Sequence, residues 1–354
     1  MRRKYKTIAF CAAVCMAVAF ACAYPTTTRT AKAQTTAKIG GFSNAAECVM
    51  ELNSRRILYE KNGDLRLPMA STTKILTAIT ILEETDDIKK EIAVPSEAIG
   101  VEGSSIYLKA GDNYSIEDLL YGLMLRSGND AATALALTSS NSVNEFAVKM
   151  NKTAQKAGAI QSNFVNPHGL PCDNHYTTAI DLSLITCYAL KNPTFAKIVA
   201  TRFYEPRQWQ NKNKLLRLYD GAIGVKTGYT KQAGKCLVSA AQKDGMKLVC
   251  TLLNCPNTYE RTIELFDDCF ANFQNVTLLD EMDVFEITDF SKSLQAQAKE
   301  KFSYPLRDEE KDYIENRIIP AKNLKKRIKK GEIVGQIEIY LLKRLLFSAN
   351  LYKL

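Results

Sequence analysis

The sequence is poor in histidine: its 354 residues include two, His168 and His175. With Cys172 they form the one place where the spacing suggests zinc ligands. No acidic partner stands beside them at a recognised metal-binding spacing, so a loop whose histidines hydrogen-bond to the backbone is the better interpretation. We therefore expect no metal site and no cofactor.

The sequence also lacks the basic stripe that would indicate nucleic-acid binding. The net charge is +9, but no basic stripe with interleaved aromatic residues accompanies it. A moderate positive balance instead favours an anionic cell surface.

A long apolar run is also missing. The longest apolar run, Ile8 to Ala23, is short for a membrane span, which needs about 20 residues. Four basic residues precede this stretch, and Ala21-Cys22-Ala23 gives a small-x-small cleavage pattern. We predict that residues 1–23 are a signal peptide and that the protein is secreted and extracytoplasmic; the alternative is a retained N-terminal anchor.

Seven cysteines follow the predicted signal peptide. An odd number cannot all pair within one chain. Several stand in apolar runs, as Cys250 does after Leu248 and Val249, where a free cysteine behaves as a small hydrophobic residue. We expect most of them to be reduced and buried.

Alternation and turn residues divide the rest of the chain. Residues 24–41 are rich in Thr, Ala and Lys and read as a linker. Strand-like segments at 45–61, 235–241 and 247–253 predict hairpins, the last two joined by a turn at Asp244-Gly245. The expected helices are 75–82, 115–138, 142–157, 179–190 and 260–273. After about 275, short β-like stretches such as 284–287 and 333–340 indicate a separate β-rich domain.

The first chemical motif is Ser71-Thr72-Thr73-Lys74, at the start of an apolar helix. Residues three apart share a helix face, so the Ser71 hydroxyl and the Lys74 amine can meet. A serine hydroxyl needs a base to become a nucleophile. A desolvated lysine near another cation has a lowered pKa and can be that base. Ser-x-x-Lys alone, however, is expected about once by chance in a chain of this length.

Two further motifs follow in order. Ser127-Gly128-Asn129 comes after an apolar stretch and presents a hydroxyl and an amide together. Lys226-Thr227-Gly228 occurs once; its lysine can hold a carboxylate and its glycine allows a close backbone approach. The ordered set is the constellation of penicillin-binding proteins and class A β-lactamases.

On these residues the chain resembles the serine-type D-Ala-D-Ala carboxypeptidases, which are low-molecular-mass penicillin-binding proteins. The resemblance extends to the flanking segments and covers about 45–270. The matching segments are 68–74, 123–132, 166–170, 175–179, 213–216 and 224–230. It implies an α/β (α+β) penicillin-binding-protein/β-lactamase-like transpeptidase fold: an antiparallel sheet flanked by helices, with a helical subdomain. The expected catalytic domain is 42–275, and a small β-rich C-terminal domain covers 276–354.

The resemblance also implies roles for the site residues. Ser71 attacks the bond between the two D-alanines of a peptidoglycan stem peptide, Lys74 takes its proton, and Ser127 relays a proton to the leaving D-Ala. The expected substrate-binding residues are Asn129, Lys226, Thr227, Gly228 and Tyr229. The amides of Ser71 and Tyr229 form an oxyanion hole, and β-lactam antibiotics acylate Ser71 covalently.

Alternatives stay open beside this interpretation. A DD-endopeptidase shares all three motifs. A class A β-lactamase needs a Glu followed four residues later by Asn between the second and third motifs, and neither Glu145 nor Glu205 has one. A non-catalytic cell-wall module would usually have lost Ser71, Lys74 or Lys226. Residues 341–347 are apolar with two basic side chains, but too short for an interfacial helix, and a final β-strand is favoured. Peripheral membrane contact is left open.

Overall fold

The computed structural model describes residues 45–289, 292–321 and 328–354. The predicted signal peptide, 1–23, and linker, 24–41, lie outside these residues. The chain divides into two compact units: an N-terminal unit within Lys38–Gln274, and a C-terminal unit that includes Asn275–Leu354.

The N-terminal unit is built on a five-stranded antiparallel sheet with the order β2-β1-β9-β8-β7. Its strands are β1 (Ala46–Glu51), β2 (Ile57–Lys61), β7 (Ala222–Thr230), β8 (Gly234–Lys243) and β9 (Met246–Leu253). Within this sheet, β1 pairs with β9, its last strand along the chain, and β7 forms one edge. The predicted hairpins at 45–61 and 235–253 are confirmed.

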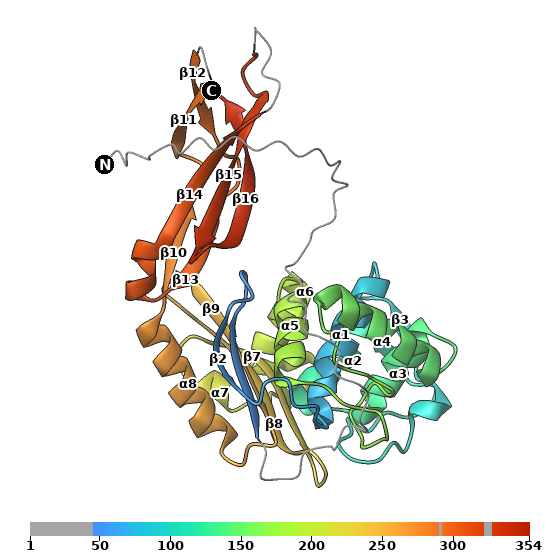
Figure 1. Ribbon diagram of the computed structural model, residues 1–354. Coiled ribbons are helices and arrows are strands. Elements are labelled where there is room, and N and C mark those ends of the chain that lie inside the picture. Colours follow the sequence, from blue (N-terminus) through green and yellow to red (C-terminus); the bar gives the residue numbers. More distant parts are fainter. Residues whose placement is uncertain (1–44, 290–291, 322–327) are drawn as a thin grey trace. The chain divides into compact units, whose positions relative to one another are not determined.

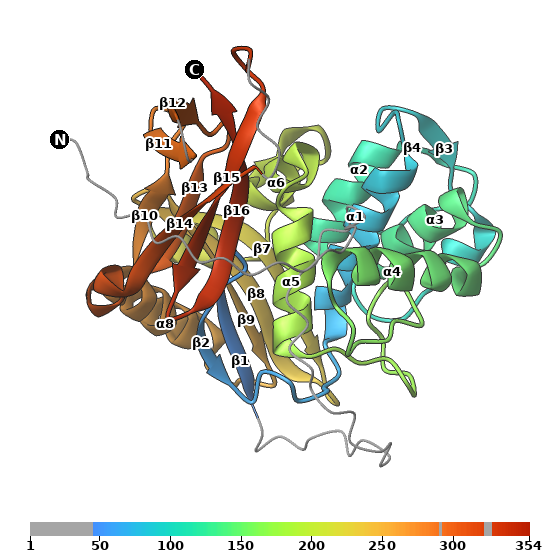
Figure 2. The same cartoon turned by 45° about the horizontal axis from the view of Figure 1, so that its top comes forward.

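Helices cover both faces of this sheet (Figures 1 and 2). Successive strand residues point to opposite faces, so Val249 packs into one hydrophobic core and Cys250 into another. Against the first face lie α5 (Ala179–Ala189) and α6 (Pro193–Ala200); against the second lie α7 (Leu215–Leu218) and α8 (Thr258–Asn272). This is the predicted antiparallel sheet flanked by helices.

A helical part surrounds α1 (Lys74–Glu84), whose first eight residues are all buried. Its neighbours are α2 (Ile116–Tyr121), α3 (Asn129–Ser139) and α4 (Val143–Ala157). Short strand pairs complete it: β3 (Glu91–Ala93) with β4 (Asn113–Ser115), and β5 (Phe203–Tyr204) with β6 (Trp209–Gln210). The segment expected to be helical over 115–138 contains a break, described below.

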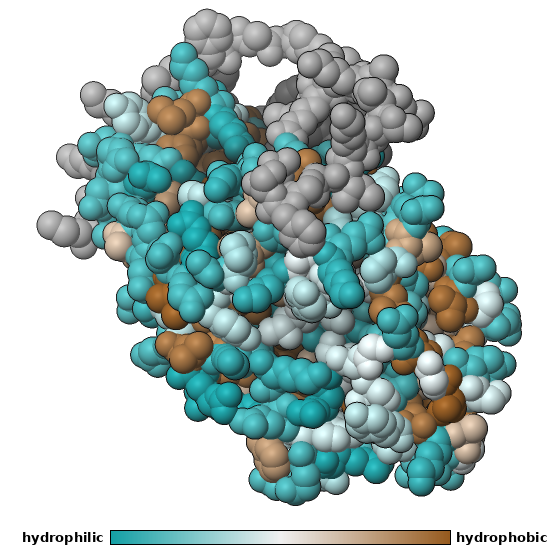
Figure 3. Space-filling view, turned by 90° about the horizontal axis from the view of Figure 1, so that it is seen from below, coloured by the Kyte–Doolittle hydropathy of each residue, from teal (hydrophilic) through white to brown (hydrophobic). Residues whose placement is uncertain are grey.

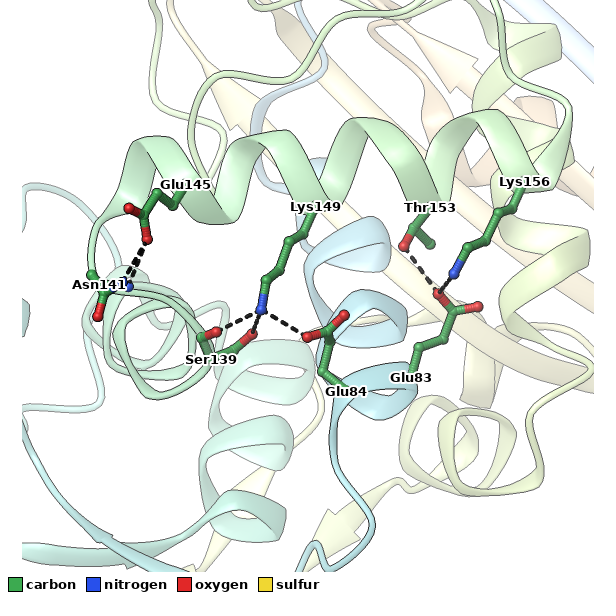
Figure 4. Close-up of polar contacts among 8 residues, drawn as sticks. All are labelled: Glu83, Glu84, Ser139, Asn141, Glu145, Lys149, Thr153 and Lys156. Atoms are coloured by element: carbon green, nitrogen blue, oxygen red, sulfur yellow. Dashed lines mark hydrogen bonds and ion pairs between the residues drawn. The ribbon is translucent and has the colours of Figure 1, made fainter.

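Polar contacts tie α4 to the end of α1 (Figure 4). Lys149 donates to the Glu84 carboxylate at 2.7 Å and to the Ser139 carbonyl at 2.6 Å. Thr153 and Lys156 both donate to Glu83, at 3.0 and 3.1 Å. These contacts fix the C-terminal end of α1, and α1 carries the first motif at its other end.

The described residues of the C-terminal unit form mainly β-strands, with one 3-10 turn at Asp308–Tyr313. Its main sheet has the order β11-β12-β16-β15-β14, and β10 pairs with β13. The strands are β10 (Gln274–Leu279), β11 (Val284–Asp289), β12 (Lys292–Gln297), β13 (Phe302–Leu306), β14 (Ile314–Pro320), β15 (Ile333–Leu341) and β16 (Arg344–Lys353). The apolar stretch at 341–347 is part of the β15–β16 hairpin, as the strand interpretation predicted.

On the face drawn in Figure 3, hydrophilic side chains cover most of the described surface and hydrophobic ones are scattered among them. Singly exposed apolar residues are normal on a folded protein. Among the described residues, no helix combines the length and apolar character that a membrane crossing requires.

Candidate active site

Ser71 lies in one turn of 3-10 helix, Ala70–Thr73, that leads directly into α1. Its side chain is half-buried, at the edge of the core. Ala70, just before it, has a φ of 49°, in the left-handed region that side-chain-bearing residues rarely adopt. Such a conformation costs about 1–3 kcal/mol and persists only where the surroundings impose it. The turn that presents Ser71 is therefore held by its neighbours.

Lys74 is fully buried, and its amine contacts three oxygens. The Nζ atom lies 3.0 Å from Ser71 Oγ, 2.6 Å from Asn129 Oδ1 and 2.6 Å from the His168 carbonyl. The amide and carbonyl oxygens can only accept, so each takes an N–H from the amine. A neutral amine then has one lone pair left, directed at the Ser71 hydroxyl.

The electrostatics favour that neutral amine. Burial, reinforced by the charges of Lys226 and Lys212, holds the pKa of Lys74 well below its usual value, and Asp130 opposes this to a smaller extent. A lysine that is unprotonated near neutral pH can take the proton of a serine hydroxyl. Ser71 and Lys74 thus make the contact that their shared helix face predicted, and the shift in the pKa of Lys74 has the direction expected for a buried lysine near other cations.

The second motif follows a π-helical turn, Gly122–Arg126, inserted between α2 and α3. Ser127 closes this turn with a φ of 67° and is buried. The continuous helix expected over 115–138 is therefore wrong, because the wider turn and the left-handed residue interrupt it. Such π turns often mark functional sites. Here the break places Ser127 and Asn129 at the start of a new helix, α3, which packs beside α1.

Asn129 and Asp130 fix a loop that the sequence did not single out. The Asn129 amide donates to the Glu102 carbonyl, and its backbone N–H donates to the Ser104 carbonyl at 2.7 Å. The buried Asp130 carboxylate accepts from the backbone of Ile106 and Leu108, both at 3.1 Å. The 102–108 loop is thereby fastened to the second motif.

The third motif lies inside a strand of its own, β7, which comes directly before the predicted strand pair β8 and β9. Lys226, Thr227 and Gly228 pair with β8 along its inner side, and the other side of β7 is the edge of the sheet. That edge faces the Ser71 turn: a Cβ placed on Gly228 would lie 3.1 Å from the Ser71 nitrogen. A side chain there would crowd the turn, so glycine permits this approach.

Lys226 is 1% exposed, and its amine donates to the Thr227 carbonyl at 2.9 Å. Burial, with the charge of Lys212 adding to it, lowers the pKa of Lys226 to about 7. Thr227 is half-buried, whereas Tyr229 is 65% exposed. An incoming carboxylate would stabilise the charged form of Lys226.

Lys212 is a cation that sequence reasoning missed. Its backbone N–H donates to the Leu125 carbonyl in the π turn, and its amine lies 3.4 Å from Ser104 Oγ. Burial and the charge of Arg126 lower its pKa. The only local signal is its place in Asn211-Lys212-Asn213, where the two asparagines form side-chain turns with the backbone.

The two histidines are held by protein groups, in line with the loop interpretation. His168 Nδ1 accepts from the Leu170 N–H at 3.2 Å. His175 Nδ1 accepts from the Val165 N–H, and its Nε2 lies 3.0 Å from Thr73 Oγ1. Burial lowers the pKa of His168 to about 3 and that of His175 to about 4. In the part of the chain that the structure describes, no three His, Cys, Asp or Glu side chains gather as metal ligands.

No disulfide joins any of the seven described cysteines, and every one except Cys172 is buried, as expected. The two glutamates weighed for a β-lactamase lie elsewhere in structural roles. Glu145 accepts from the backbone and side chain of Asn141 at the start of α4, both at 3.0 Å (Figure 4). Glu205 begins a short 3-10 turn beside β5.

Comparison with known proteins gives two family matches along the chain. Residues 31–257 match the family described as D-alanyl-D-alanine carboxypeptidase, and residues 273–354 match the C-terminal domain of penicillin-binding protein 5. The chain is similar to D-alanyl-D-alanine carboxypeptidase DacF of Bacillus subtilis, with 30% identity over 82% of this chain and 79% of that one. A DacA of Haemophilus influenzae is 30% identical over 86% of this chain and 82% of its own.

Solved structures agree with the sequence matches. The structure of penicillin-binding protein 5 from Haemophilus influenzae superposes with a TM-score of 0.72 at 26% identity. It covers 87% of this chain and 96% of that one. Both units of the fold therefore have counterparts in a single known protein.

Proposed function

Because the chain belongs to the D-alanyl-D-alanine carboxypeptidase family, we propose that it is a serine-type enzyme that removes the terminal D-Ala from peptidoglycan stem pentapeptides. One observation carries the mechanism: the buried amine of Lys74 contacts Ser71 Oγ at 3.0 Å while two acceptor-only groups take its hydrogens. The reaction then runs through an acyl-enzyme on Ser71.

In the first step Ser71 Oγ attacks the carbonyl carbon between the two D-alanines, and its proton passes to Lys74. The backbone amides of Ser71 and Tyr229 bind the oxyanion, a contribution typically worth about 3 kcal/mol per donor. The closeness of β7 to the Ser71 nitrogen supports this arrangement. The C–N bond then breaks, and a proton relayed by Ser127 leaves with the amine of free D-Ala.

In the second step water attacks the ester carbonyl of the acyl-enzyme, and Lys74 again accepts a proton. The Ser71 oxygen leaves and regains its hydrogen, and the shortened peptide is released as a carboxylate. A β-lactam ring takes the place of the peptide bond in the first step, so penicillin acylates Ser71 covalently.

The substrate lies along the open edge of β7. An extended peptide can add to a sheet edge through main-chain hydrogen bonds, and Gly228 leaves room for its backbone beside the Ser71 turn. Lys226 and Thr227 bind the terminal carboxylate, and the Asn129 amide contacts the substrate backbone.

We also propose the domain division and location read from the sequence. Residues 42–275 form the catalytic domain and 276–354 a β-rich C-terminal domain; the two compact units and the limits of the family matches support this. With residues 1–23 as a signal peptide, the enzyme is secreted and meets its substrate outside the cytoplasm.

The test is D-Ala release from a stem pentapeptide by the purified protein, with Ser71→Ala as its partner. We expect release by the wild type, loss in the variant, and a penicillin mass adduct on wild-type Ser71 alone. Release that persists in Ser71→Ala would contradict the mechanism. Cleavage of a cross-linked muropeptide dimer in preference to the pentapeptide would make the protein an endopeptidase, and rapid turnover of penicillin a β-lactamase.

A further inference from the structure

His175 is a buried imidazole whose hydrogen-bonding state the structure fixes. The ring is 4% exposed and makes an edge contact with Phe164 at a centroid distance of 5.9 Å. Its Nδ1 accepts the Val165 N–H at 3.0 Å and therefore carries no hydrogen. In a neutral ring the hydrogen must then lie on Nε2, so His175 donates to Thr73 Oγ1 across the 3.0 Å contact.

The Thr73 hydroxyl extends this hydrogen-bond chain in the same donor-to-acceptor direction. Its oxygen receives the Nε2–H of His175, and its own hydrogen goes to the Ala70 carbonyl at 2.9 Å. Three hydrogen bonds thus run in one sense, from the Val165 amide through the ring and the hydroxyl to the Ala70 oxygen. Chains of this kind polarise their members.

The Ala70 carbonyl belongs to the same peptide unit as the Ser71 N–H. A trans peptide is planar, with its C=O and N–H antiparallel, so whatever holds the Ala70 oxygen also sets the direction of the Ser71 N–H. Hydrogen bonding to the oxygen also makes that N–H a stronger donor. Packing acts on the same atom, since a Cβ on Gly169 would lie 1.9 Å from it.

We propose that His175 and Thr73 are positioning residues that orient and polarise the Ser71 N–H as an oxyanion-hole donor. This rests on the proposed function, in which the Ser71 amide binds the oxyanion. The relay also explains why the left-handed Ala70 is held in place: its carbonyl is fastened by a hydroxyl that is itself fastened by a ring.

The variants separate the relay from packing. Thr73→Val removes the hydroxyl and keeps the shape, whereas Thr73→Ser keeps the hydroxyl. Thr80 offers a matched control: it lies on α1, the helix that directly follows Thr73, is 1% exposed, and its hydroxyl makes no hydrogen bond to any described residue. Thr80→Val should therefore leave acylation unchanged. Thr73→Ala replaces Thr73→Val if the latter does not fold.

The measurement is the acylation of Ser71 by a fluorescent penicillin, resolved into binding and rate constants by stopped flow. Loss of one oxyanion donor costs about 10²–10³-fold, and loss of its orientation should cost part of that. We expect acylation by Thr73→Val to slow about tenfold or more with its binding constant little changed. Thr73→Ser should recover most of the rate, and His175→Phe should show a smaller loss than Thr73→Val.

Infrared difference spectra of the acyl-enzyme give a readout that packing alone would not move. With ¹³C-labelled penicillin carbonyl, a weaker oxyanion hole shifts the ester stretch of Thr73→Val to higher wavenumber. Thr73→Ser and Thr80→Val should retain the wild-type frequency.

The outcomes distinguish this proposal from the one on which it rests. If wild type is not acylated, or Ser71→Ala is, the proposed function fails. If wild type is acylated but Thr73→Val acylates as fast as Thr80→Val with an unshifted carbonyl, the relay is wrong and the function stands. Slow acylation with an unshifted carbonyl would also overturn the relay, because it would show a loss of structure and not of oxyanion binding.

Discussion

At the scale of single residues, the site is governed by three lysines in a small space. Lys74 and Lys226 are buried, and Lys212 adds its charge to the environment of both. Each cation weakens proton binding by the others. The same crowding therefore lowers the pKa of both Lys74 and Lys226.

Lys226 gives a pH dependence whose sign can be worked out. Its pKa is about 7 in the folded protein and about 10.4 in an unfolded chain. Between these values the unfolded chain binds a proton that the folded protein does not, so stability rises with pH at up to about 1.4 kcal/mol per pH unit. From pH 7.5 to 9, the free energy of unfolding of the wild type should rise by about 2 kcal/mol more than that of Lys226→Met.

Urea denaturation at the two pH values measures this difference. Lys74 also makes the free energy of unfolding rise with pH, but it does so in both proteins. Its contribution therefore cancels to first order in the difference between wild type and Lys226→Met. Equal pH dependence in wild type and Lys226→Met would mean that Lys226 keeps an ordinary pKa in the fold.

At the scale of elements, α1, the π turn and β7 meet at the candidate active site, and the 166–175 loop packs against α1. Two side chains of α1 hydrogen-bond to the backbone of that loop: Thr77 donates to the Pro167 carbonyl at 2.7 Å, and Lys74 donates to the His168 carbonyl. Gly169 has a φ of 88° and lies directly against the Ala70 oxygen. The loop is therefore part of the support of the Ser71 turn.

Gly169→Ala tests that support. The added Cβ would meet the Ala70 oxygen at 1.9 Å, in addition to the strain of a positive φ. We expect the free energy of unfolding to fall by more than about 2 kcal/mol and penicillin acylation to slow sharply. Gly111→Ala is the control: its φ is 81°, but no atom lies within 4 Å. It should lose about 1 kcal/mol and keep its acylation rate. Equal effects in the two variants would show that the contact is unimportant.

Local sequence pattern predicted much of this level. Alternation gave the β1–β2 and β8–β9 hairpins, and apolar periodicity gave α4, α5 and α8. The break at Ser127 was not visible as a helix end, because Leu123 to Leu125 continue an apolar run and a π turn has no strong local signal. The strand around Lys226 was not predicted because it contains two glycines. Glycine weakens the sequence pattern of a strand, even at a position where close packing of the backbone requires it.

The motifs brought together Ser71, Lys74 and Asn129 correctly, but not their supports. Lys212, Asp130 and the Thr73–His175 contact act across more than 20 residues of sequence, and no spacing rule links them. His175 was noticed as a rejected zinc ligand and as the first residue of a segment shared with the family, but not as a partner of Thr73. Long-range partners of this kind follow from tertiary packing, and no repeating pattern of residues in a single sequence predicts them.

At the scale of the whole molecule, the two units have separate hydrophobic cores. In the C-terminal unit, Ile337, Ile339 and Leu351 are fully buried in a cluster of its own. The catalytic motifs all lie on elements of the N-terminal unit. Stability and chemistry should therefore be separable by mutation.

Ile337→Ala makes that separation measurable. Removing a fully buried isoleucine side chain usually costs about 2–5 kcal/mol, here confined to the C-terminal core. Calorimetry should show two transitions, of which one moves to lower temperature, and the rate of Ser71 acylation at 25 °C should stay unchanged. A single transition that moves as a whole would show that the two units unfold together.

The cysteines have one more consequence. Burial raises the pKa of the Cys48 and Cys236 thiols to about 12, so at neutral pH they are protonated, enclosed and slow to react. Cys172 alone among the described cysteines is exposed, and it stands in the loop that supports the Ser71 turn. Among these residues the protein thus carries a natural attachment point for a spin label or fluorophore. A probe placed there would report on the surroundings of this loop during acylation, without removal of any other described cysteine.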